Sequence, residues 1–436
     1  MAERPEDDGD KKADLAGGED HIGALPDVLL QQVLSLLPSR QAVRTCVLST
    51  RWRTLWKSVP SVRINSAGEL YRNPQALSKF ANHLLLLRDR TPLHECEINS
   101  YYGGDSDEAF QYIELWLRYA VSCQVRVLRV LVKNELKDLC LSNVSLHTQH
   151  LASLELCSVE VGGHFLDFSS CPALKVLKME HCKLSALRIS SKSLNHLIIN
   201  YGNLGCRARI SAPSLITLEL DEFTGYTPLL EPMPSLIRAF LRFGENCYDR
   251  CDNSNYFGDC GSQLCLGCSF IKYYGNGDCL LLEGLSGTEY LELISQSQLV
   301  MPATPVVLCH VFIGRMDFKW RVMFSQLKAL LLSEWCMVAD FSGLIYFLEH
   351  SPILERLTLQ LKYYEEESAI ETEESYNTRS RFLVSKHLKV VEIKCRKEDE
   401  TILKILKILV THGVPPERIN VKPNFQDYGL GCFSFE

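Results

Sequence analysis

Residues 22–62 read IGALPDVLLQQVLSLLPSRQAVRTCVLSTRWRTLWKSVPSV, and prolines divide this stretch into three short helices. Pro26 opens the first helix, because proline suits the first helical turn, and Pro38 ends it. We expect Ser39 to cap the second helix and Ser49 the third, since a serine hydroxyl accepts hydrogen bonds from free backbone amides. The spacing therefore predicts a small helical unit near the start of the chain.

Each predicted helix carries an apolar stripe. About forty residues in three helices cannot bury this much apolar surface internally. A stripe with two tryptophans left in water predicts a partner surface. The residue pattern is equally consistent with helices that cap a larger core of the same chain. The three stripes comprise Leu29, Val33, Leu36 and Leu37; Ala42, Val43, Cys46 and Val47; and Leu48, Trp52, Leu55 and Trp56.

The segment DHIGALPDVLLQQVLSLLPSRQAVRTCVLSTRWRTLWKSVP resembles an F-box of the plant type. The leading LPD, the central LP, the AVRT and VLS runs, the Trp52-Arg53 pair and Trp56 stand where that family has them. Cys46 and Thr50 replace residues that vary in the family. The resemblance implies docking onto a Skp-type adaptor and, through it, onto a cullin-based ubiquitin ligase.

We assign the F-box to residues 20–63 and expect it to carry the docking surface. Some of its apolar residues must hold the three helices together instead, and the sequence does not separate the two groups. The residues predicted to carry docking are Leu25, Pro26, Val28, Leu29, Val33, Leu34, Leu37, Pro38, Val43, Val47, Leu48, Trp52, Leu55 and Trp56.

A second pattern, apolar-x-x-apolar-x-apolar, recurs along the rest of the chain. Between Leu151 and Leu236 its copies start 23, 20, 21 and 21 residues apart, an interval typical of leucine-rich repeats. Chance periodicity in a leucine-rich globular domain is the alternative, and several copies near one spacing argue against it. Each repeat buries its apolar face on its neighbours, so the array shares one core. The residues between the leucines would line an exposed concave sheet that binds a target: Glu155, Lys178, Ile198 and Glu219.

The C-terminal unit, HLKVVEIKCRKEDETILKILKILVTHGVPPERINV, predicts a strand, an amphipathic helix and another strand. It resembles the FBD module that follows leucine-rich repeats in many plant F-box proteins, mainly through LKVVEI and the acid-then-leucine helix. Its THGVPPE departs from the helix end usual in that family, which leaves the boundary of the module open. We expect this unit to cap the open end of the solenoid.

Six cysteines lie among Gly, Asn and Asp in an irregular stretch, residues 243–285: Cys247, Cys251, Cys260, Cys265, Cys268 and Cys279. The CxxC pair Cys265 and Cys268 could bind zinc or act as a redox pair. The other spacings fit no standard zinc site, no histidine is interspersed, and no thioredoxin-like context surrounds the pair. Structural thiols are the simplest interpretation, and we expect no metal and no cofactor.

Composition and charge limit the classes of partner. The chain has 436 residues, 46% hydrophobic and 23% charged, and a net charge of -7, of which residues 1–20 carry -5. The remainder is nearly neutral, so no global attraction to nucleic acid is expected. Residues 39–63 hold six basic residues and no acid, which favours a solvated face or an acidic protein partner over nucleic acid. No secretory signal or membrane span is recognisable in the sequence. Because disulfides form mainly in secreted proteins, we expect the eighteen cysteines to be reduced thiols in the nucleus or cytoplasm.

The sequence thus predicts an α/β chain: a three-helix F-box, then a leucine-rich-repeat solenoid with a strand and a helical or irregular return in each repeat, then an α+β C-terminal cap. No phosphate-binding loop, HExxH or GxSxG motif is present, so we expect a non-catalytic protein. The expected units are an acidic disordered tail (1–19), the F-box (20–63), a linker with the first helical repeat elements (64–120), the solenoid (121–360, with the irregular stretch 243–285), an acidic loop (361–381) and the FBD-like cap (382–425).

The leading functional hypothesis is a substrate-recognition adaptor of a Skp–cullin–F-box ubiquitin ligase, with an unidentified target protein and neither nucleic acid nor membrane as partner. A second hypothesis is a repeat scaffold that binds the adaptor but never joins a cullin. A third makes the cysteine-rich stretch a zinc or redox site.

Overall fold

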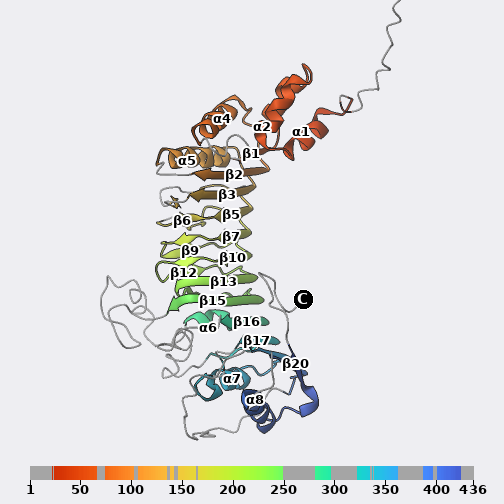
Figure 1. Ribbon diagram of the computed structural model, residues 1–436, viewed down its shortest axis with the longest axis vertical. Coiled ribbons are helices and arrows are strands. Elements are labelled where there is room, and N and C mark those ends of the chain that lie inside the picture. The colour runs from red at the N-terminus through yellow and green to blue at the C-terminus, as the bar shows by residue number, and fades with distance from the viewer. Residues whose placement is uncertain are drawn as a thin grey trace, which may run out of the picture.

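The structure is a computed structural model in which helices at the N-terminal end lead into a long row of strands (Figure 1). Within the described residues, no helix is long and apolar enough to cross a membrane. The described residues are 22, 24–65, 74–102, 107–134, 138–141, 146–163, 165–248, 280–295, 322–333, 336, 338–361, 386–395 and 400–423.

The N-terminal unit consists of the three expected helices: α1 (Asp27–Ser35), α2 (Ser39–Arg44), which continues into the 3-10 turn η1 (Thr45–Val47), and α3 (Trp52–Leu55), which continues into η2 (Trp56–Ser58). Pro26 and Pro38 precede α1 and α2 as expected. The two expected serine caps are wrong. Neither α2 nor α3 has a side-chain cap, and Ser39 Oγ instead accepts a hydrogen bond from the backbone amide of Arg63.

One parallel sheet runs through the rest of the described chain, with each long strand paired to the next in sequence order. This continuous ladder confirms the predicted solenoid. The long strands are β1 (Ser61–Asn65), β2 (Glu95–Tyr102), β3 (Val127–Asn134), β5 (Ser153–Cys157), β7 (Val176–Glu180), β10 (His196–Asn200), β13 (Thr217–Tyr226), β15 (Arg238–Tyr248), β16 (Tyr290–Ser295), β17 (Ala329–Ser333), β18 (Arg356–Gln360), β19 (Val390–Cys395) and β20 (Ile419–Pro423).

The register of these strands stacks the repeat leucines on one another. Leu154 pairs with Leu177, which pairs with Leu197, and Leu197 pairs with Leu218, and all four are buried. Successive side chains of a strand point to opposite faces, so the residues between them are half-buried on the other face of the sheet. We call this second face the open face. The repeat pattern in the sequence therefore forms one continuous core, which no single repeat could close alone.

The return segments differ between the middle and the ends of the solenoid. The short repeats in the middle leave too little chain for a helix, so their returns consist of short strands. The strands β4 (Leu139–Cys140), β6 (Val159–Val161), β8 (Lys183–Leu184) and β11 (Asn203–Leu204) belong to the main sheet, and β9 (Arg188–Ser190), β12 (Arg209–Ser211) and β14 (Leu229–Leu230) form a second sheet. Towards the two ends the returns contain helices: α4 (Pro74–Leu87), α5 (Asp107–Ser122), α6 (Leu280–Leu285), α7 (Val338–His350), α8 (Glu400–Thr411) and the short η7 (Pro416–Arg418).

The solenoid is longer at both ends than we expected from the sequence. Strand β1 begins inside the predicted F-box range and pairs in register with β2. The described parts of residues 64–120 hold α4, β2 and α5, which belong to the first repeats. Val59, Val62 and Ile64 carry the same apolar spacing as the later repeats and could have been recognised. At the other end β19 and β20 continue the same sheet, so the FBD-like unit extends the solenoid.

Three of the predicted segments fall largely outside the described residues: the acidic tail 1–19, the acidic loop 361–381, and most of the irregular stretch 243–285 with the CxxC pair. The described ends of the irregular stretch are regular, since β15 runs to Tyr248 and α6 begins at Leu280.

Candidate functional site

The three N-terminal helices enclose a small core of their own. Its buried members come from all three helices and from the segment after η2, and half-buried Leu25 and Leu37 pack against it. Leu30 is completely buried, although the sequence interpretation assigned it no role. Of the residues predicted to carry docking, Leu34, Trp52 and Leu55 lie inside this core. The buried members are Leu30, Leu34, Ala42, Trp52, Leu55 and Val59.

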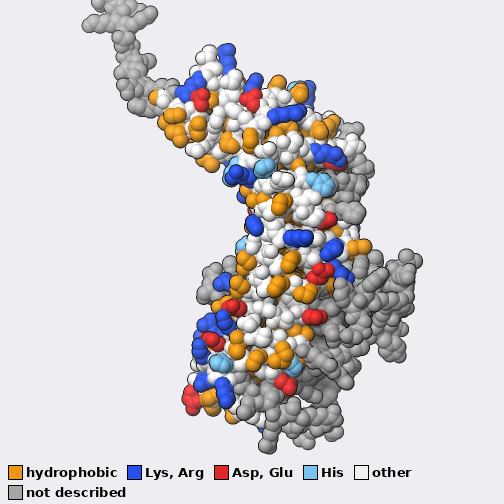
Figure 2. Space-filling view, turned by 180° about the vertical axis from the view of Figure 1, so that it is seen from behind, with side chains coloured by type: hydrophobic (Ala, Val, Ile, Leu, Met, Phe, Trp, Pro, Cys, Tyr) orange, Lys and Arg blue, Asp and Glu red, His pale blue; other side chains and the backbone are white. Residues whose placement is uncertain are grey.

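The opposite side of α1 presents apolar side chains to solvent. Leu29, Val33 and Leu36 recur at helical spacing and are 43%, 50% and 72% exposed, and we call them the α1 stripe. Four more residues of the predicted docking set are exposed: Pro26, Val28, Val47 and Leu48. Two others, Pro38 and Val43, are half-buried. Figure 2 shows hydrophobic side chains gathered on this part of the molecule, at the upper left. Clustered exposed apolar residues of this kind mark an interaction surface.

The prediction of an exposed tryptophan stripe is wrong. Both Trp52 and Trp56 are only 8% exposed. Trp52 fills the small helical core, whereas Trp56 packs into the core of the solenoid and its Nε1 donates a hydrogen bond to the Arg53 carbonyl at 3.0 Å. The sequence left open whether these helices cap a core of the same chain or present a partner surface. The structure shows features of both, because the third helix packs onto the same chain while the α1 stripe faces solvent.

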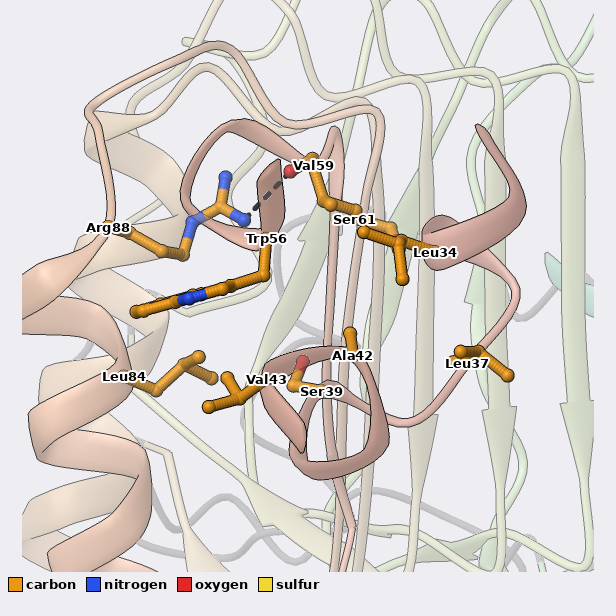
Figure 3. A pocket seen from close by; sticks show the side chains of 10 residues that line it. All are labelled: Leu34, Leu37, Ser39, Ala42, Val43, Trp56, Val59, Ser61, Leu84 and Arg88. Carbon is orange, nitrogen blue, oxygen red and sulfur yellow. Dashed lines mark hydrogen bonds between the residues drawn. The ribbon is translucent and has the colours of Figure 1, made fainter. Parts of the chain in front are cut away.

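A closely packed junction joins the helices to the solenoid (Figure 3). Arg88, directly after α4, lies along one side of the Trp56 indole, and Leu84 and Val43 lie on the other side. The Arg88 guanidinium is buried and donates a hydrogen bond to the Val59 carbonyl at 2.7 Å. The remaining cavity is about 10 Å³, roughly the space of a single water molecule.

Two further hydrogen bonds tie α1 and α2 to the first strand. Ser61 Oγ donates to the Ser35 carbonyl at 2.8 Å, and the Arg63 amide donates to Ser39 Oγ at 2.8 Å. Because buried polar groups are costly to leave unpaired, these bonds favour one orientation of the helices on the edge of the sheet. The junction therefore positions the α1 stripe relative to the solenoid.

Replacing Arg88 with methionine tests the junction. We expect the change to keep much of the packing volume but to leave the Val59 carbonyl without its donor, which costs about 1–3 kcal/mol of unfolding free energy. Chemical denaturation would measure the loss, and hydrogen exchange at α1 and β1 would locate it. The exposed neighbour Arg90→Met is the matched control, and an equal loss in the control would contradict the role of Arg88.

The four residues predicted on the sheet lie side by side on the open face. Glu155 of β5 pairs in register with Lys178 of β7, which pairs with Ile198 of β10, which pairs with Glu219 of β13. All four are half-buried. The structure thus brings this set together as one row across neighbouring strands.

Most of the described cysteines are buried. Cys96 and Cys182 lie in the solenoid core, and burial raises the pKa of each thiol to about 12, so both stay protonated near neutral pH. Cys182 Sγ lies 3.5 Å from the Leu156 carbonyl, which it contacts as a weak donor. Among the residues that the structure covers, no group of His, Cys, Asp or Glu could hold a metal ion. Cys247 is buried in β15, and the other cysteines of the irregular stretch lie outside the described residues.

These features define the class of protein: an F-box joined to a leucine-rich-repeat solenoid. Residues 22–63 match the F-box domain family. The N-terminal unit of the chain is therefore similar to an F-box domain, as the resemblance in its sequence indicated.

The relatives of the chain extend this similarity beyond the F-box. The F-box/FBD/LRR-repeat protein At5g22700 of Arabidopsis thaliana is 25% identical over 437 residues, which cover 91% of this chain and 90% of that protein. The F-box/FBD/LRR-repeat protein At5g22660 of the same plant is 27% identical over 55% of this chain and 60% of its own length. The putative FBD-associated F-box protein At5g50270, also from Arabidopsis thaliana, is 30% identical over 51% of this chain and 62% of its own length. The last two matches span less than two thirds of those relatives.

Proposed function

We propose that this chain is the substrate-recognition subunit of a Skp–cullin–F-box ubiquitin ligase. The F-box would dock on a Skp-type adaptor, the adaptor would connect it to a cullin, and the open face of the solenoid would hold a target protein. The observation that carries this proposal is the solvent-exposed α1 stripe on an F-box that packs against its own solenoid through Trp56. An apolar surface of this kind gains free energy when a partner covers it.

The mechanism is one of proximity. The chain would contribute no bond-making group, and the chemistry would belong to other subunits. A target held on the solenoid has a high effective concentration at the ligase, which raises the rate of transfer without a new catalytic residue. The junction around Arg88 supports this role, because a fixed angle between F-box and solenoid presents a bound target in a reproducible direction.

Reconstitution tests the proposal. The full chain, produced together with a Skp-type adaptor, is expected to co-purify with it in a one-to-one complex, and the complex is expected to bind a cullin. Failure to bind the adaptor would refute the assignment. Adaptor binding without cullin binding would instead favour the scaffold that acts outside a ligase. We further propose that the protein works in the nucleus or cytoplasm, which imaging of a tagged chain would test.

A further inference from the structure

Over the first strands of the open face, acidic and basic side chains pair with one another. Glu95 of β2 forms ion pairs with Arg63 of β1, at 3.0 Å, and with Arg129 of β3. Arg129 also reaches Glu155 of β5 at 3.0 Å. On β7, Lys178 lies 3.7 Å from Glu180. From β1 to β7, therefore, each of these acids has a basic partner on the same or a neighbouring strand, although Arg63 and Arg129 each pair with two acids.

The balance changes at β13. Glu219, Asp221 and Glu222 lie close together there, and a single guanidinium, that of Arg242 from β15, forms ion pairs with Asp221 and Glu222, each at 3.3 Å. Among the described ion pairs, none includes Glu219, although the Asn200 side chain donates a hydrogen bond to its carboxylate and the Lys178 cation lies near enough to favour its charged form. Burial and the neighbouring Asp221 carboxylate raise the pKa of Glu219, while burial is also the main cause that raises the pKa of Asp221. This part of the open face thus holds more negative charge than its own cations neutralise.

The surroundings of Glu219 form a defined niche. In the register of the sheet, Glu219 stands between Ile198 of β10 and Phe240 of β15, and Asn200 stands beside Asp221. Asp221 is 1% exposed, yet its Oδ1 accepts no hydrogen bond, because Arg242 approaches it as an ion pair without hydrogen-bond geometry. Asn200 Oδ1 is also buried without a donor. We call Ile198, Asn200, Glu219, Asp221 and Phe240 the Glu219 niche.

We propose that the Glu219 niche binds a lysine or arginine side chain of the target protein. This inference rests on the proposed function and specifies the chemistry of the segment that the solenoid recognises. The aliphatic stem of such a side chain would lie against Ile198 and Phe240, and its cation would pair with Glu219. An acidic side chain would add to the surplus charge, and a neutral one would cover the Glu219 carboxylate without a cation to pair with it, which is costly.

A random dodecapeptide library displayed on phage is the probe, and the purified full chain with its adaptor is the bait. We expect selected peptides to be enriched at least about twofold in lysine and arginine over the starting library, and Glu219→Gln to remove this enrichment. Glu114→Gln is the matched control, because it removes the same charge from α5, outside the open face, where Arg118 already pairs with the carboxylate. We expect the control to keep the enrichment. Glu219→Leu serves as a second variant that removes the carboxylate if the first variant does not fold.

Three results would overturn the inference. The first is no enrichment in basic residues with the unaltered chain, and the second is enrichment that survives both changes at Glu219. The third is an equal loss of enrichment in Glu114→Gln, which would indicate attraction by net charge alone. Binding of the Skp-type adaptor is measured on the same samples. Intact adaptor binding with a failed niche refutes only this inference, whereas lost adaptor binding in the unaltered chain refutes the proposed function itself.

Discussion

Val33→Glu is expected to weaken binding of the Skp-type adaptor by at least about a hundredfold while the chain stays folded. Val33 lies in the middle of the α1 stripe between Leu29 and Leu36 and is half exposed, so the free protein accommodates a carboxylate there in water. In a complex the same carboxylate would be buried against an apolar partner without a cation. Burying an unpaired charge costs several kcal/mol, and about 2.7 kcal/mol already corresponds to a hundredfold change in affinity.

The matched control is Leu403→Glu, which places the same charge on an exposed apolar position of α8, at the far end of the solenoid. Titration of the labelled adaptor would give both dissociation constants, and circular dichroism would confirm that both variants remain folded. Equal affinity of the two variants would show that the adaptor does not use α1, and the docking site would then have to be sought elsewhere on the chain.

The periodic part of this fold could be predicted from the sequence. Leu154, Leu177, Leu197 and Leu218 are recognisable because each repeat places an apolar side chain at the same step, and the register of the sheet then stacks them. The α1 stripe follows from the same kind of argument, since residues three and four apart share one face of a helix. Local spacing determines both features, so no contact between distant segments was needed to find them.

The roles of the two tryptophans could not be predicted in this way. Their spacing shows that Trp52 and Trp56 can share one side of a helix, but it does not show what covers that side. Trp56 is covered by Leu84 and Arg88 of the first return segment, about thirty residues later in the chain, and Trp52 by α1 and α2. Which apolar face remains free for a partner thus depends on contacts between distant segments. Only the structure shows that Val33 is exposed whereas Trp52 is buried.

Trp52→Ala is expected to unfold the F-box and leave the solenoid intact. Truncating a buried tryptophan costs about 3–5 kcal/mol of unfolding free energy. The core around Trp52 has only six buried members and is separate from the main core, so little other burial can compensate the loss. The solenoid strands contact one another through the main core, which does not include Trp52, and we expect them to keep their protection.

Hydrogen exchange followed by mass spectrometry would distinguish the two parts, with loss of protection expected in α1 to α3 and none in β5 to β13. Trp52→Phe is the control, because it retains an aromatic ring in the same core and should restore most of the protection. Adaptor binding should fall with Trp52→Ala even though the indole itself is buried, because the α1 stripe keeps its geometry only while Leu30 and Leu34 have a core to pack on. If the solenoid amides exchanged as fast as those of the F-box, the two cores would be one cooperative unit, and the variant could no longer separate docking from folding.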